Sequence, residues 1–162
     1  MTAHNSQRGG AAVGQLRHLD PVEAGAVLYL RLWSDGPAGQ DNARSDFDIG
    51  LGADAGQTAF SALEQICGLC VRYGRRPLIR HHLSCSCVGA DESCFANMVA
   101  AASQGDREDA IMMAALIVRA DLAPCLAGLA ESLGLALRRM AAIETACPDP
   151  VTTLTPSAPR LH

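Results

Sequence analysis

A stripe of leucines near the C-terminus is the feature that most constrains the fold. Apolar side chains recur there at helical spacing: Leu122, Leu126, Leu129, Leu133, Leu137 and Met140. Since an α-helix turns once in about 3.6 residues, this spacing predicts a helix with one long apolar face. Such a face must be buried against other elements. The chain is rich in alanine and leucine, which are strong helix formers, so we expect those elements to be helices too.

Capping signals and periodicity predict four further helices. Asp20, Pro21 and Glu23 form a capping box with proline at the first helical position, so one helix should begin there. The others are expected over residues 54–73, 90–103 and 106–120. Residues 111–118 are apolar on every side, which predicts the most buried helix of the protein. The fold class is therefore all-α: a single-domain bundle or orthogonal array of about five helices with flexible termini.

The remaining segments favour loops over strands. Residues 34–54 are rich in glycine and aspartate and are predicted to be mainly loop, with a short helical turn at 43–47 as an alternative. The best strand candidate, residues 47–51, alternates only briefly. The expected organisation is as follows: a flexible N-terminal segment at 1–17, a helical domain at 18–146 with a Cys/His-rich connector at 74–89, and a flexible Pro/Thr-rich tail at 147–162.

Composition excludes several classes of function. All thirteen basic residues are arginine, which suggests a GC-rich bacterial genome and excludes Schiff-base and P-loop lysine chemistry. The net charge of −4 argues against nucleic-acid binding. The first residues lack the apolar core of a signal peptide, and the longest apolar run has nine residues, against about 20 in a membrane span. We expect a cytoplasmic protein with no membrane partner and with reduced cysteines.

The concentrated chemical feature is a Cys/His cluster that predicts a metal site. A C-x-x-C pair lies in the second predicted helix, and a histidine pair and a C-x-C pair follow in the connector. The candidate ligands are Cys67, Cys70, Cys85, Cys87, His81 and His82. Cysteines three apart on a helix share a face, as do cysteines two apart in an extended loop. Together they could hold tetrahedral Zn²⁺, or an iron–sulfur cluster with Cys94 as an additional thiolate.

Two alternatives to metal binding remain open. Cys67 and Cys70 lie in the apolar arc of their helix, where free cysteine packs as a small hydrophobe. Cys85 and Cys87 have no such packing explanation, so they are the expected ligands if a metal binds. The second alternative is thiol redox chemistry, although the C-x-x-C pair lies near a helix C-terminus, where the helix dipole disfavours a thiolate.

Positive charge is concentrated from Arg72 to His82. This basic cluster could bind a phosphate, an acidic partner or a nucleic-acid backbone. Alternatively, its arginines could pair with Asp91, Glu92 or helix C-termini.

Every candidate for a catalytic residue also has an explanation in packing or helix capping. The sequence therefore favours a small helical accessory or regulatory protein that binds Zn²⁺ or an iron–sulfur cluster, with a protein partner or a second copy of itself as its expected contact. A metal-free helical interaction module with core cysteines is one alternative. A thiol-redox or metal-dependent enzyme is the other.

Overall fold

The computed structural model describes residues 8–147 and shows a mostly helical protein with six α-helices and a small two-stranded sheet. The helices are α1 (Pro21–Ser34), α2 (Pro37–Leu51), α3 (Ala53–Tyr73), α4 (Ala90–Gln104), α5 (Arg107–Ile117) and α6 (Ala123–Ala146). The strands are β1 (Ala12–Gln15) and β2 (Cys87–Gly89), and short 3-10 helices cover Arg8–Gly10, Leu16–His18 and Ala120–Leu122. Apart from Cys147, the predicted C-terminal tail lies outside the described residues.

The start of α1 confirms the predicted capping box. The Asp20 carboxylate accepts hydrogen bonds from the amides of Val22 (2.8 Å) and Glu23 (2.9 Å), and the Glu23 carboxylate accepts one from the Asp20 amide (3.3 Å). These bonds satisfy amide groups that a helix N-terminus otherwise leaves unpaired. The sequence therefore sets the position at which the first helix begins.

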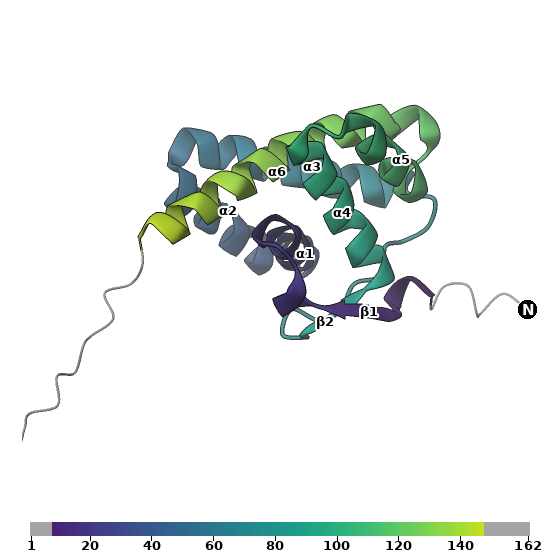
Figure 1. The fold of residues 1–162 in the computed structure, drawn as a ribbon, viewed down its shortest axis with the longest axis horizontal. Coiled ribbons are helices and arrows are strands. Elements are labelled where there is room, and N and C mark those ends of the chain that lie inside the picture. Colours follow the sequence, from purple (N-terminus) through teal and green to yellow (C-terminus); the bar gives the residue numbers. More distant parts are fainter. Residues whose placement is uncertain (1–7, 148–162) are drawn as a thin grey trace, which may run out of the picture.

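The predicted leucine stripe lies on α6, which packs against α1, α3, α4 and α5. Leu126, Leu133 and Leu137 are buried along it. In Figure 1, α6 runs across the molecule while α1 is seen nearly end-on, so these two helices cross steeply. Residues 120–146 are long and apolar enough to cross a membrane, a property that α6 shares with core helices of soluble proteins.

Helix α2 corrects the predicted loop at residues 34–54. Pro37 occupies the first turn of this helix, and Ala43 and Phe47 place an apolar face against the core. Gly36 and Gly52 adopt positive φ angles of 96° and 85° at its ends, so the glycines separate helices instead of forming one long loop. The brief alternation at residues 47–51, the best strand candidate, lies at the C-terminal end of this helix.

Helix α5 corrects the prediction of a fully covered helix at residues 111–118. Its side chains Met112 and Leu116 are 65% and 71% exposed. The helix has only eleven residues and packs one side against α4 and α6, with Ala110 and Ala114 buried in the contact. Small alanines let α5 approach α4 and α6 closely, while Met112 and Leu116 lie on the outer side of the helix.

The N-terminal segment is more ordered than the sequence predicts. Strand β1 pairs antiparallel with β2, with Ala12 opposite Gly89 and Gln15 opposite Cys87. Figure 1 shows this sheet on the opposite side of the molecule from α6. From residue 8 onward, the predicted flexible segment 1–17 therefore contains a 3-10 helix, a strand and the start of a second 3-10 helix, while residues 1–7 lie outside the described part.

Two glycines of α6 allow a matched test of the α4–α6 contact. A Cβ on Gly134 would lie 2.7 Å from both the Val99 carbonyl oxygen and the Ser103 Cβ, whereas a Cβ on Gly128 would meet nothing within 4 Å. We expect Gly134→Ala to lower the free energy of unfolding by about 1–3 kcal/mol through overpacking. Gly128→Ala should raise it by about 0.5–1 kcal/mol, because alanine favours the helix. Urea unfolding measures both, and equal effects of the two substitutions would contradict this packing.

Candidate functional site

A buried ion pair joins α1 to α4 beneath the connector. Arg31 lies in the last turn of α1, and Glu92 in the first turn of α4. The Glu92 carboxylate accepts from Arg31 Nε at 2.6 Å and from Nη2 at 2.9 Å, a bidentate geometry. The two side chains are 1% and 0% exposed. Such charges are stable away from water only when they are paired and fully hydrogen-bonded.

The remaining hydrogen-bonding capacity of Arg31 is directed at the connector backbone. Its Nη1 donates to the carbonyls of His82 (3.2 Å) and Cys85 (2.7 Å), and Nη2 donates to the carbonyl of Cys87 (2.6 Å). One guanidinium therefore fixes the backbone on both sides of the C-x-C pair.

Glu92 binds the connector from the other direction. Its carboxylate accepts from the amides of His81 (3.0 Å) and Gly89 (2.9 Å). Burial by itself would raise the pKa of Glu92, but the hydrogen bonds from Arg31 and from these two amides outweigh it and hold that pKa below its usual value.

Three arginines of the basic cluster form contacts of the kind that the second alternative predicts. Arg76 forms a bidentate pair with Asp91 at 2.6 and 2.7 Å. Arg75 donates to the Ala115 carbonyl near the end of α5, and Arg80 donates to the Ser34 carbonyl at the end of α1. These side chains fasten the connector to α1, α4 and α5.

A thiol–imidazole pair lies on the connector held in this way. Cys85 Sγ is 3.6 Å from His81 Nδ1, and His81 Nε2 is 2.8 Å from the carbonyl oxygen of Gly10. Because a carbonyl only accepts, Nε2 carries a proton, and Nδ1 faces the sulfur as the acceptor or as the imidazolium donor. Glycine at position 9 allows the contact between Gly10 and His81. The backbone of Gly9 packs so closely on Asp91 that a Cβ there would collide with the carboxylate.

The surroundings of Cys85 favour its thiolate. The backbone N–H of Cys87 and the His81 imidazole lower the pKa of Cys85 by hydrogen bonding, and the Cys87 thiol adds to the effect. The hydrogen bonds to Gly10 and Cys85 raise the pKa of His81. The two groups therefore move toward a thiolate–imidazolium pair, which is the nucleophilic form of cysteine. Cys85 and Cys87 are both half-buried, so solvent reaches them.

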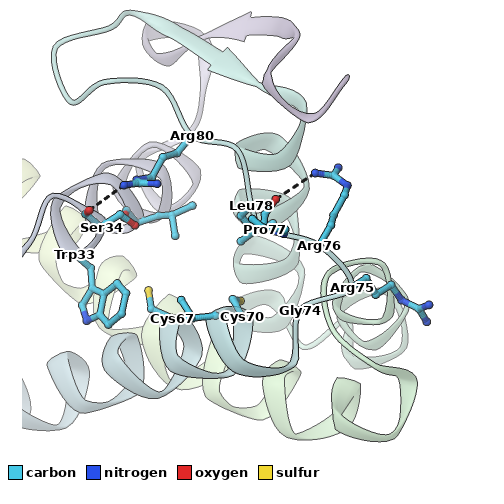
Figure 2. A pocket seen from close by; sticks show the side chains of 12 residues that line it. Trp33, Ser34, Cys67, Cys70, Gly74, Arg75, Arg76, Pro77, Leu78 and Arg80 are labelled. Atoms are coloured by element: carbon cyan, nitrogen blue, oxygen red, sulfur yellow. Dashed lines mark hydrogen bonds between the residues drawn. The ribbon is translucent and has the colours of Figure 1, made fainter. Parts of the chain in front are cut away.

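The C-x-x-C pair has the opposite environment. Cys67 and Cys70 are buried, 2% and 7% exposed, in the apolar face of α3. Burial raises the pKa of Cys70 to about 12 and that of Cys67 further still. Both side chains line a cavity beneath the connector (Figure 2). The apolar position that the sequence predicts for these two cysteines is confirmed, and their role as metal ligands stays a prediction.

The structure brings only some of the predicted ligands together. Cys85 contacts His81, while His82 Nδ1 lies 2.9 Å from the Ser84 hydroxyl and Cys67 and Cys70 lie in the core. Within residues 8–147, no group of three or more His, Cys, Asp or Glu side chains is arranged to hold a metal ion. Ligation of Zn²⁺ or an iron–sulfur cluster therefore stays a prediction.

Sequence reasoning missed three residues that build the site. The sequence analysis gives Arg31 no role and considers Glu92 only as a partner for the connector arginines. It also assigns Gly10 to a flexible segment. One signal was available: Arg31 stands between Leu30 and Leu32 in an apolar helix, where a charged residue needs a buried partner.

Comparison with protein-family models, with curated proteins and with solved structures finds no match for this chain.

The ion pair generates a stability prediction. We expect Arg31→Met to lower the free energy of unfolding by about 3–5 kcal/mol, because it leaves Glu92 buried without a counter-charge. Glu92→Gln should act in the same direction. Removing both charges in Arg31→Met/Glu92→Met should cost less than the sum of Arg31→Met and Glu92→Met, because neither charge is then left unpaired. Urea unfolding measures all four variants.

Arg119→Gln serves as the control for those variants. It removes an exposed ion pair with Asp121, so its effect should stay below about 1 kcal/mol. Strictly additive losses in the double variant would contradict the proposed coupling.

Proposed function

We propose that this protein carries out thiol–disulfide exchange, with Cys85 as the nucleophile, His81 as its acid–base partner and Cys87 as the resolving thiol. The observation that carries the proposal is the contact between Cys85 Sγ and His81 Nδ1, in a histidine whose other nitrogen is held by the Gly10 carbonyl. A nucleophile, a base and a group that orients the base form the arrangement that activates cysteine in many proteins.

The exchange proceeds in two balanced steps. The Cys85 thiolate attacks one sulfur of a substrate disulfide, which forms a mixed disulfide and releases the other sulfur as a thiolate that takes the His81 proton. The Cys87 thiol then loses its proton to His81, and its thiolate attacks Cys85 Sγ. This second attack closes a Cys85–Cys87 disulfide and releases the second substrate thiol. Two electrons pass from the cysteine pair to the substrate disulfide, and a dithiol reductant reverses the change.

The environments of the two cysteine pairs support a role for C-x-C over C-x-x-C. Thiolate character decides which cysteine attacks, and burial keeps Cys67 and Cys70 protonated. Cys85 has both a lowered pKa and access to solvent. Arg31 is a positioning residue here, because it holds the carbonyls of Cys85 and Cys87.

In this proposal, the accessory or regulatory role that the sequence favours is a redox reaction with another protein. The cysteine pair exchanges electrons with the disulfide of a partner protein, so the expected protein partner becomes the redox substrate. The exposed position of His82 and Ser84 around the pair leaves room for a polypeptide to approach.

Glutathione disulfide as a substrate tests the roles of the two cysteines. The wild-type protein should lose two hydrogens as Cys85 and Cys87 form a disulfide. Cys87→Ser should instead accumulate a glutathione adduct on Cys85, because no thiol resolves it. Intact-mass measurement with peptide mapping distinguishes these products.

Cys125→Ser is the matched control for that experiment, since Cys125 is an exposed cysteine outside the site. It should behave as the wild type does. An adduct that forms first on Cys125, or a disulfide that joins Cys67 to Cys70, would overturn the proposal.

The pH dependence of alkylation tests the role of His81. Because the pKa of Cys85 is lowered, its reaction with iodoacetamide should persist below the pH at which an ordinary thiol, of pKa about 8.5, becomes protonated. In His81→Gln the midpoint of the rate profile should move upward, toward the value measured for Cys85 in urea-unfolded protein. Peptide mapping follows Cys85 separately from the other cysteines. A midpoint that is the same in folded and unfolded protein would contradict an activated thiol.

A further inference from the structure

A cavity of about 420 Å³ lies between the ends of α1 and α3 and the connector that crosses over them. Its volume is within the range of about 300–1,000 Å³ in which proteins bind small molecules. Figure 2 shows the Cys67 side chain on α3 and the Trp33 side chain on α1 facing it, with Pro77 and Leu78 of the connector on the far side. The thiol site described above does not use this space.

The wall of the cavity is apolar. Leu30, Trp33, Val71, Pro77 and Leu78 supply hydrocarbon and aromatic surface. The two thiols of α3 add neutral sulfur, because burial keeps them protonated. A ligand body that contacts this wall gains free energy by leaving water and needs few polar groups.

One arginine supplies a free positive charge at the rim. Arg80 is exposed, and within residues 8–147 its one hydrogen bond runs from Nη2 to the Ser34 carbonyl at 2.9 Å, so other N–H groups are left to bind a ligand. Its positive charge partly offsets the rise in the pKa of Cys67 that burial causes, and both residues line the cavity.

The other two lining arginines are engaged elsewhere. Arg75 and Arg76 point away from the cavity in Figure 2. Arg75 donates to the Ala115 carbonyl near the end of α5, and Arg76 pairs with Asp91. Among the described residues that line the cavity, none is acidic. The site therefore offers a largely apolar wall and, in Arg80, one cationic group at its mouth that no described carboxylate neutralises.

We propose that this cavity binds an amphipathic monocarboxylate, such as a medium-chain fatty acid, with its chain against Trp33 and Leu78 and its carboxylate on Arg80. A planar guanidinium pairs with a carboxylate through two parallel hydrogen bonds, which fits a single arginine at the mouth. An apolar body suits a wall of carbon and neutral sulfur. A multiply charged ligand would lack further cations to neutralise it.

Decanoate is the probe for the first experiment. Trp33 is the one tryptophan of the chain, so its fluorescence reports on the cavity wall directly. Decanoate should change the emission saturably, and decanol should bind at least tenfold more weakly because it cannot pair with Arg80. Isothermal calorimetry repeats both titrations independently of fluorescence. The absence of saturable decanoate binding by both methods would overturn the proposal, and so would equal affinity for decanol.

A second experiment tests the contribution of Arg80. Arg80→Gln should weaken decanoate binding about tenfold and leave decanol binding unchanged. Arg119→Gln removes the same charge from an exposed arginine outside the cavity and should leave decanoate binding as it is in the wild type. Because Arg80 is exposed, circular dichroism should show that its variant is folded. Equal decanoate affinity in Arg80→Gln and the wild type would overturn the assignment of Arg80.

Discussion

The buried pair of Arg31 and Glu92 is the interaction on which the connector depends. Removing two charges from water costs several kcal/mol for each ion, and their mutual attraction offsets this only when every donor and acceptor is used. Here the surplus hydrogen-bonding groups bind the backbone of residues 81–89, a segment that runs outside the helices until β2 begins. The pair therefore replaces the backbone partners that a helix or sheet would otherwise provide.

This organisation divides the cysteines into two chemical types. Cys67 and Cys70 face the interior from α3, where the low dielectric favours the neutral thiol. Cys85 lies on the polar connector, where an amide and an imidazole stabilise its anion. Neighbouring arginines in the sequence do not cause this difference in pKa between the cysteine pairs, because their guanidinium groups mainly bind carboxylates and helix carbonyls. Burial and hydrogen-bond geometry decide which thiol ionises.

Features encoded in short segments could be predicted from the sequence, and features that depend on distant pairing could not. The Asp20 cap and the stripe on α6 are local, and both are confirmed. Helix α2 was missed for two reasons. Its glycines are typical of a loop, and its buried face consists of only a few residues, among them Phe47. The site joins Gly10, Arg31 and Glu92 to the connector, and no local pattern places such distant residues together.

The link between Gly10 and His81 makes the chemistry of Cys85 a property of the finished fold. Seventy-one positions separate these two residues, so the histidine is oriented only after β1 has docked beside β2. A nascent chain carries seven cysteines, yet none of them has this activated neighbourhood. Under the proposed exchange, the nascent chain therefore contains no activated thiol until the contact between Gly10 and His81 has formed. Formation of the tertiary structure then creates the proposed nucleophile, because the residues that surround Cys85 come from distant parts of the chain.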